Sequence, residues 1–298
     1  MVTSDQKSEI LYHGIGFTPT VSILNILISV FIFFQTINSS FAQQKPPYKI
    51  YKTFEEAFAN PLEVKHLRVS YDKLTSIPAE IGALKNLEIL ELNNNLIVEL
   101  CPEIGKLTKL KRLNLFRNKL KILPKEIGNL IELEVFIASS SQIEQVPKEI
   151  GNLQKLKRLS LKFNKLTTLP DEICELSLLE YFDVSFNELN SIPDEIGNLE
   201  ELKFFYLGNN FILSIPPSIG NLHRINQLHI GRNSLEELPD ELINLTSMKE
   251  LDVANSGVLL RLPEGGGQLR NLEYLYRDGN TIVPYSYYSN TRLKTIYR

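Results

Sequence analysis

The residues best suited to chemistry in this chain are its histidines, its cysteines and a row of glutamates. Histidine can act as a general base or a metal ligand and cysteine as a nucleophile, but each needs a partner at a defined spacing. The four histidines, His13, His66, His223 and His229, are scattered, and no C-x-x-C or H-E-x-x-H spacing occurs. We therefore predict no catalytic residue and no enzymatic activity.

The row of glutamates could suggest a calcium site, because its members recur at multiples of 23 residues. The row consists of Glu80, Glu103, Glu126, Glu149, Glu172, Glu195 and Glu241. A divalent cation needs several oxygens that converge on one point, whereas these carboxylates would lie one repeat apart. Lys125 and Lys148 also stand beside two of them. We interpret the row as a solvated face, and predict no metal and no cofactor.

The glutamate spacing belongs to a repeat that fills most of the sequence. Each copy carries a segment such as LPKEIGNL or LPDEICEL, followed by L-x-x-L-x-L-x-x-N-x-L, as at Leu110, Leu113, Leu115, Asn118 and Leu120. The prolines keep one register, at Pro78, Pro124, Pro147, Pro170, Pro193, Pro216 and Pro239, with Cys101 in the one vacant position. Period-two alternation in x-L-x-L-x sends side chains alternately inward and outward, so each copy should add one strand to a parallel sheet.

These motifs resemble the 23-residue leucine-rich repeats with an L-P-x-E-I-G-x-L half, found in secreted bacterial repeat proteins and in plant and animal Ras-group repeat proteins. The resemblance covers about ten repeats, from Val64 to Ile282. It implies an α/β repeat fold: a curved leucine-rich-repeat solenoid with a parallel β-sheet on its concave face and a cap at each end. It also implies binding of another protein, although the fold alone does not specify function.

Several residue types have structural interpretations within such repeats. The asparagine at each strand end can satisfy turn backbone groups that would be costly to bury alone. Ser141 replaces it in one central repeat, where we expect local loosening or a water molecule. Cys101 and Cys174 lie three repeats apart, roughly 14 Å at the strand spacing of a sheet, which is too far for a disulfide. We predict two small buried thiols.

Glycine accumulates at residues 265–267, where a phosphate-binding loop could be considered. Such a loop needs a preceding strand, a following helix and a lysine, and none of these accompanies the run. Gly266 instead takes the isoleucine position of a repeat. Arg277 takes an inward leucine position in the same repeat, so the pattern degrades toward its C-terminal end.

The sequence divides into four segments. Residues 1–42 hold an apolar run from Val21 to Phe34 and a small-residue site ending at Ala42, which predict a cleaved signal peptide. Residues 43–63 form an N-terminal cap, in which Thr53 and Glu56 indicate a capping box that opens a short helix. Residues 64–284 form the repeat domain, and residues 285–298 a C-terminal cap or tail.

Cellular location depends on the first of these segments. Its start is long and not basic, with Asp5 and Glu9 against Lys7, so an uncleaved anchor or a misplaced start codon are alternatives. We expect a secreted or extracytoplasmic protein without a stable membrane span in its mature form, and the alternative is a cytoplasmic one. The net charge of −3 provides no global attraction to nucleic acid.

The outward strand positions should form the binding surface, since successive strands present them on one extended face. Aromatic residues gather in the middle of this face, where interface hot spots favour them. The predicted partner-binding residues are Arg112, Phe116, Arg117, Arg158, Lys162, Phe163, Tyr181, Asp183, Phe186, Phe204, Tyr206 and His229. The alternative is that some of these rings only pack against neighbouring strands.

The leading hypothesis is a non-enzymatic protein-binding or adhesion module that acts as a monomer. Basic residues in the first half and acidic ones toward the end of the face would complement an oppositely charged protein ligand; a glycan is the alternative ligand. The competing hypothesis is an intracellular signalling scaffold of the Ras-group kind, which would require the N-terminal apolar segment not to be a signal peptide.

Overall fold

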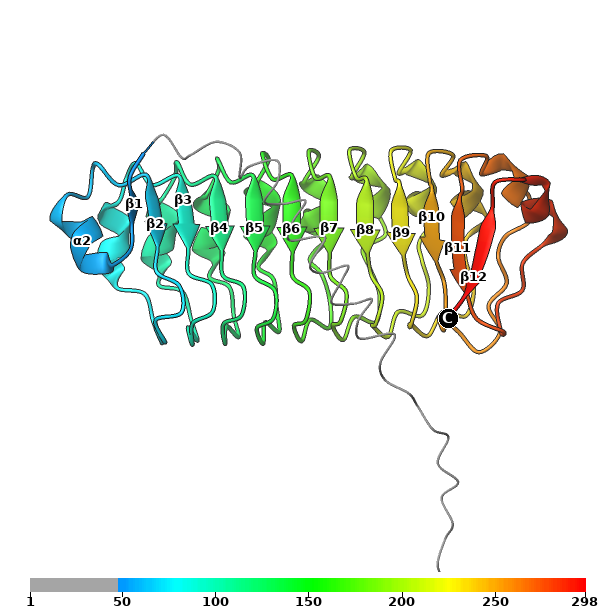
Figure 1. Cartoon of the computed structure of the whole chain (residues 1–298), viewed down its shortest axis with the longest axis horizontal. Coiled ribbons are helices and arrows are strands. Elements are labelled where there is room, and N and C mark those ends of the chain that lie inside the picture. The colour runs from blue at the N-terminus through cyan, green and yellow to red at the C-terminus, as the bar shows by residue number, and fades with distance from the viewer. Residues whose placement is uncertain (1–47) are drawn as a thin grey trace, which may run out of the picture. The chain divides into compact units, whose positions relative to one another are not determined.

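The computed structural model describes residues 48–298, which form one array of repeats. The predicted signal peptide, residues 1–42, lies outside the described residues. Twelve strands of the described part pair side by side in chain order to give one parallel sheet, with the turns that follow them on its other side (Figure 1). The predicted leucine-rich-repeat solenoid, with its parallel sheet along one curved face, is confirmed.

Most strands contain only three residues. They are β1 (Ile50–Tyr51), β2 (His66–Arg68), β3 (Ile89–Glu91), β4 (Arg112–Asn114), β5 (Val135–Ile137), β6 (Arg158–Ser160), β7 (Tyr181–Asp183), β8 (Phe204–Tyr206), β9 (Gln227–His229), β10 (Glu250–Asp252), β11 (Tyr274–Arg277) and β12 (Lys294–Tyr297). Equivalent residues pair across the sheet, as Leu113 with Phe136 and Phe136 with Leu159. In the three-residue strands the middle residue is fully buried, and the residue on either side of it faces away from the core.

The opposite side of the array consists of 3-10 turns. They are η1 (Ala79–Ala83), η2 (Pro102–Lys106), η3 (Lys125–Asn129), η4 (Lys148–Asn152), η5 (Asp171–Glu175), η6 (Ile196–Asn198), η7 (Pro217–Asn221), η8 (Asp240–Asn244), η9 (Gly266–Gln268) and η10 (Tyr285–Ser289). In most repeats the motif proline is the extended residue before the turn, as at Pro124 with φ −68° and ψ 148°. The following Ile127 and Leu130 are fully buried and close the core on this side.

The glycine that follows the isoleucine is required by the stacking of these turns. A Cβ on Gly128 would lie 2.4 Å from the backbone oxygen of Glu149 in the next turn. Cys174 and Ile243 occupy this glycine position in two repeats, and the turns stacked on them, η6 and η9, contain three residues instead of five. A larger side chain is thus accommodated by shortening the next turn.

The buried asparagines form the ladder that the sequence predicts. Asn164 donates from Nδ2 to the carbonyls of Ala138 (3.0 Å) and Leu161 (2.8 Å), and its Oδ1 accepts from the amide of Ile143 (3.0 Å). Each amide therefore joins two repeats and satisfies groups that would otherwise be buried unpaired. At Ser141 the shorter side chain leaves a buried hydroxyl without a hydrogen-bond partner among the described residues.

Both cysteines carry free thiols. Cys174 is buried, and burial raises the pKa of its thiol to about 12. The prediction that Cys101 is also buried is wrong, because its side chain is only partly covered. It stands in a proline position before η2, where the chain turns at the surface.

Both ends of the array extend the sheet by one strand. At the N-terminal end β1 precedes the helix α2 (Phe54–Ala59), and Thr53 accepts a hydrogen bond from the amide of Glu56 (3.2 Å) as the N-cap. At the C-terminal end η10 and β12 continue the repeat through residues 285–298. The buried ring of Tyr287 fills the space left at Gly266, where a Cβ would lie 2.2 Å from it. This contact gives the glycine run a packing role.

Candidate ligand-binding surface

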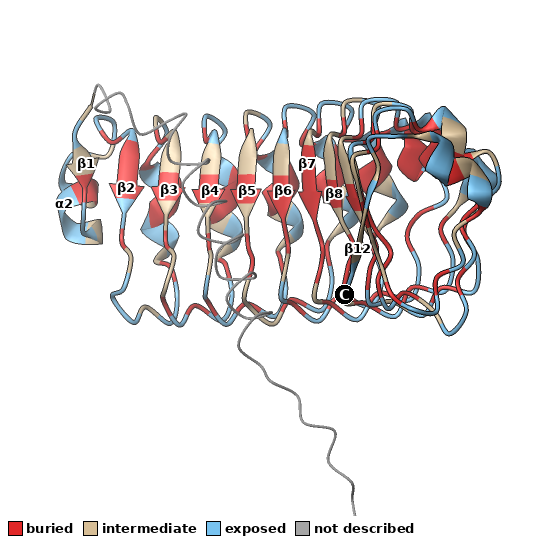
Figure 2. Cartoon of the chain, turned by 45° about the vertical axis from the view of Figure 1, so that its right-hand side comes forward, coloured by how far each residue is buried: buried red, intermediate tan, exposed pale blue. Residues whose placement is uncertain are grey.

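The outward residues of β2–β11, with the residues that directly follow each strand, form a surface that we call the sheet face. In Figure 2 the middle of strands β3–β6 and β8 is buried, while their ends are mostly intermediate. All the predicted partner-binding residues lie on this face. In the structure, some of these residues pack against one another more closely than the sequence alone predicts.

The centre of the sheet face is a chain of ring contacts that we call the aromatic belt, made of Tyr181, Phe204, Tyr206 and His229 on β7–β9. The ring centroids of Tyr181 and Tyr206 are 5.5 Å apart, and those of Tyr206 and His229 are 4.8 Å apart in an edge-on arrangement. The guanidinium carbon of Arg158 lies 3.8 Å from the Tyr181 ring centroid. Stacking on the ring and burial together hold this cation in place, and burial lowers its pKa from the usual value.

Two of the predicted contact residues are buried beneath this surface. Tyr181 is 7% exposed and Asp183 is 5% exposed. The Tyr181 hydroxyl donates to Oδ2 of Asp183 (3.2 Å), while Oδ1 accepts from the amide (3.0 Å) and the hydroxyl (2.6 Å) of Ser185. Burial raises the pKa of Tyr181 well above its usual range, so the phenol stays protonated. The geometry of these two residues fits the alternative prediction, in which outward side chains only pack against neighbouring strands.

A second cluster lies just beyond the strand ends, and we call it the phenylalanine pair. Phe163 and Phe186 stack with their ring centroids 4.2 Å apart. Lys162 places its ammonium 5.3 Å from the first ring centroid and 5.1 Å from the second. Phe163 is 40% exposed. The pair therefore presents apolar rings and a positive charge on the sheet face.

Each phenylalanine occupies a backbone position that large residues rarely take. In nine consecutive repeats the residue at this position has positive φ, which is 55° at Phe163 and 57° at Phe186. The same position in other repeats is held by Tyr71, Asn94, Arg117, Ser140, Asn209, Arg232 and Asn255. Asparagine tolerates left-handed backbone because its short side chain bonds locally, whereas a bulky residue is unfavourable there. Nothing in the fold requires aromatic rings at these two positions.

The remaining predicted residues lie toward the N-terminal end of the sheet face. The guanidinium carbon of Arg117 lies 5.1 Å from the Phe116 ring centroid, and Arg112 begins β4. The structure thus brings the predicted residues together in three groups, of which the aromatic belt with Arg158 is the most extensive.

The acidic residues near the C-terminal end are engaged within the protein. Glu250 lies 3.0 Å from Nε2 of His229, and Asp252 lies 2.6 Å from Nη1 of Arg298. Asp278 accepts from the hydroxyl of Thr281 (2.8 Å) and from the amide of Asn255 (2.8 Å). These pairings were not predicted from the sequence. The repeat register could have indicated one of them, because it places Glu250 and His229 on adjacent strands. The negative charge of Asp252 is therefore compensated by Arg298, whereas Asp278 is held by neutral donors.

Groups with potential for catalysis or metal binding also have internal partners. His66 shares the carboxylate of Glu91 with Arg68, at 3.1 Å from Nε2. Within residues 48–298 no cluster of three or more histidine, cysteine or carboxylate side chains could hold a metal ion. No helix in that range is long and apolar enough to cross a membrane.

Comparisons with known proteins place these features in a family context. The profile of the family described as leucine-rich repeat region matches residues 56–168 and 139–234. Among solved structures, a leucine-rich-repeat protein from Leptospira interrogans is 32% identical with a TM-score of 0.70, and the alignment covers 83% of this chain and 69% of that one. No curated protein matches the chain.

Plant receptors are also similar. The plant peptide hormone receptor RGFR1, solved in complex with RGF2, is 26% identical with a TM-score of 0.65, over 86% of this chain and 49% of the receptor. A TDR receptor is 26% identical with a TM-score of 0.62, over 83% and 50%. The chain thus spans about half the length of these two receptors.

Proposed function

Because the chain belongs to the leucine-rich-repeat family, we propose that it is a non-enzymatic binding module that recognises a polypeptide ligand across the sheet face. The similar plant peptide hormone receptor RGFR1 was solved in complex with RGF2. Extended surfaces of this kind suit a polypeptide, since each repeat offers a few side chains along one direction. Adhesion to a surface-bound protein would be one use of the same binding mode.

The phenylalanine pair is the observation that carries this proposal. Left-handed backbone at a bulky residue is unfavourable by about 1 kcal/mol or more, and stacking of the two rings offsets about that amount. The pair therefore gains the fold little over asparagine, which occupies the same position elsewhere. Partly exposed apolar rings that add little to stability are explained by contact with a partner, because aromatic anchors contribute strongly to interfaces.

The charges around the pair indicate which polypeptides would fit. Lys162 lies against both rings, and Arg117 is exposed at the equivalent left-handed position two repeats earlier. The acidic residues toward the C-terminal end are already paired or hydrogen-bonded. A ligand with an apolar side chain flanked by carboxylates would be complementary to this part of the sheet face.

The experiment selects peptides from a displayed random library on the immobilised full chain and measures their affinities by fluorescence polarisation. Replacing Phe163 and Phe186 together with asparagine should weaken the selected peptides by at least tenfold. The matched control is Tyr71→Asn, which removes an exposed aromatic ring from the same backbone position at the far end of the array. Equal affinities for the wild type and the double variant would refute the proposal.

We propose further that the protein acts outside the cytoplasm, as the apolar segment before the repeats suggests. Mass spectrometry of the mature N-terminus in the native host tests this. An N-terminus at Gln43 in an exported fraction is the expected result. An intact Met1 in the cytoplasm would instead favour the intracellular scaffold.

A further inference from the structure

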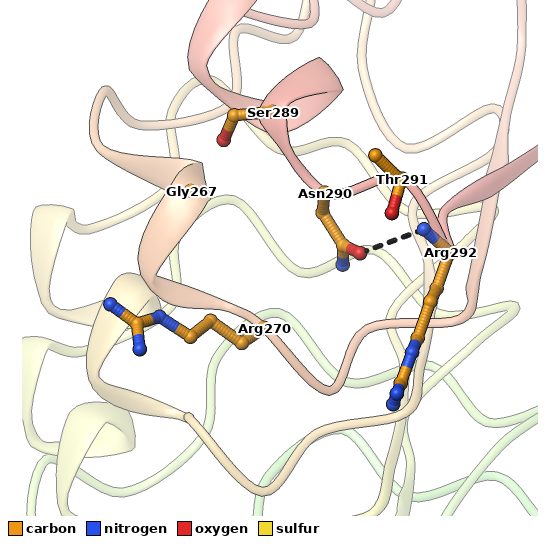
Figure 3. A pocket seen from close by; sticks show the side chains of 6 residues that line it. All are labelled: Gly267, Arg270, Ser289, Asn290, Thr291 and Arg292. Atoms are coloured by element: carbon orange, nitrogen blue, oxygen red, sulfur yellow. Dashed lines mark hydrogen bonds between the residues drawn. The ribbon is translucent and has the colours of Figure 1, made fainter.

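A small pocket lies between the last two 3-10 turns, away from the sheet face. Its volume is about 410 Å³, and it is lined by Gly267, Arg270, Ser289, Asn290, Thr291 and Arg292. No carboxylate lines it, whereas two arginines and two hydroxyl side chains do. Figure 3 shows Arg270 and Arg292 extending along different sides of the pocket, with Ser289 facing across it from η10.

The pocket has a polar base because an asparagine replaces a leucine of the repeat there. Asn290 stands where the preceding repeat has Leu269, at the residue that ends the 3-10 turn. Its Nδ2 donates to the carbonyls of Leu269 (3.1 Å) and Leu272 (2.8 Å), and its Oδ1 accepts from the amide of Arg292 (3.0 Å). The amide is therefore fully engaged and holds the backbone of Arg292 against the pocket (Figure 3).

Other cations at the repeat position of Arg292 are paired with a side chain one repeat earlier. Lys155 lies 2.7 Å from Glu132, Arg224 contacts Glu201, and Lys109 donates to Oδ1 of Asn86 at 2.8 Å. The residue one repeat before Arg292 is Asn271, whose Nδ2 donates to the carbonyl of Thr246, as Nδ2 of Asn86 donates to the carbonyl of Leu62. Unlike Oδ1 of Asn86, its Oδ1 accepts no hydrogen bond from the following repeat within residues 48–298. The side-chain contact made by Lys109, Lys155 and Arg224 at this position is thus missing at Arg292 in the described part of the chain.

The same contrast holds across the arginines of the described residues. Eight of the eleven have an ion pair, a hydrogen bond or a ring contact within residues 48–298. The three others are Arg232, Arg270 and Arg292, and two of these three line this one pocket. Two guanidinium groups without a carboxylate beside them give this concave site a positive local charge, which favours an anion.

We propose that this pocket binds a tetrahedral oxyanion, the phosphate or sulfate group of a ligand. Guanidinium groups bind such oxyanions through pairs of parallel N–H···O bonds, and the hydroxyl of Thr291 can donate to a further oxygen. The hydroxyl of Ser289 already donates to the carbonyl of Ser286 (2.7 Å). The two guanidinium ends lie apart in Figure 3, so the anion would draw them together over the pocket. Because both arginines are exposed, an isolated anion should bind in the millimolar range and weaken with salt.

The test titrates the full chain with inorganic phosphate and, in a second arm, inorganic sulfate, at constant ionic strength. Arginine Nε–H resonances followed by NMR report the binding. Saturable shifts at two arginines in the wild type, and at least tenfold weaker binding after R270Q and R292Q together, are expected. Binding in one arm only would assign the group as phosphate or as sulfate.

The matched control is R224Q, because Arg224 occupies the same repeat position as Arg292 but contacts Glu201. It should leave the affinity unchanged. The proposal is overturned if the shifts rise linearly without saturation, if the R270Q/R292Q variant binds as the wild type does, or if R224Q weakens binding equally. Acetate that binds as tightly as sulfate would also overturn it, since a planar monoanion lacks the third oxygen and the second charge.

Discussion

The central repeats depart from the repeat consensus mainly at outward positions, whereas the C-terminal repeats depart from it mainly at inward positions. Ser141 and Cys174 are inward exceptions in the central repeats. In the centre, β4–β8 keep buried leucine or phenylalanine inside, and unusual residues such as Phe163 and Tyr206 face outward. From β10 onward the unusual residues are in the inward pattern: Ser256 replaces asparagine, Gly266 replaces isoleucine and Asn290 replaces leucine.

The difference shows where a repeat protein can vary at little cost. An outward side chain has few fixed neighbours, so its identity is available for recognition of a ligand. An inward side chain belongs to a close-packed interior and needs a compensating change one repeat away. Tyr287 opposite Gly266 is one such compensation, and the short turns η6 and η9 stacked on Cys174 and Ile243 are two others.

The largest expected effect concerns the asparagine ladder. Asn164→Ala removes three hydrogen bonds to buried backbone groups, and should lower the free energy of unfolding by about 4 kcal/mol. Asn290→Ala in the terminal turn, where water can replace the lost contacts, should cost about 1 kcal/mol. Urea unfolding of both variants measures the difference. Equal losses would show that the end of the array is as tightly constrained as its centre.

Acid should destabilise the N-terminal end before the centre. Glu91 is largely buried, which raises its pKa, but hydrogen bonds from His66 and Arg68 outweigh this and lower the pKa to about 2. A lowered carboxyl pKa stabilises the fold above the unfolded-state value of 4.5 and loses this contribution as pH falls toward 2. The loss is up to about 3 kcal/mol. The protection factors of the β2 and β3 amides, which correct for the intrinsic pH dependence of hydrogen exchange, should fall between pH 5 and pH 3, and Glu91→Gln should flatten this dependence.

A smaller difference is expected between two substitutions at the glycine position of the 3-10 turns. Gly128→Ala would place a Cβ 2.4 Å from the Glu149 backbone oxygen and should cost about 2 kcal/mol through forced movement of η4. Cys174→Ala, at the same position under a shortened turn, should cost less than about 1 kcal/mol. Thermal unfolding of the two variants makes the comparison. Comparable shifts would contradict the compensation between this position and the length of the next turn.

The smallest expected effect is on the sheet face. Phe163→Asn with Phe186→Asn should change the free energy of unfolding by less than about 1 kcal/mol, because the lost ring stacking and the relieved left-handed strain nearly cancel. Chemical denaturation measures this in the same preparations used for peptide binding. A loss of several kcal/mol would assign the pair a structural role and remove the main support for the binding surface.

The repeat pattern alone was sufficient to predict several elements. The leucines and asparagines recur at the positions that the structure buries, and the outward positions derived from alternation lie on the sheet face. The helix opened by Thr53 also followed from the sequence, because its cap uses a side chain only three residues away. The twelve predicted partner-binding residues remain a prediction, and Tyr181 and Asp183 are too buried to be direct contacts without rearrangement.

The amino-acid sequence by itself determined the solenoid, its sheet and the identity of its two faces, because a strict period leaves only one way to bury a continuous apolar stripe. Only the tertiary structure decided which outward groups neutralise one another, as with His229 and Glu250, and which do not, as with Arg270 and Arg292. The physical reason is that these contacts depend on side-chain directions and on small differences between neighbouring turns, and a periodic pattern averages over both.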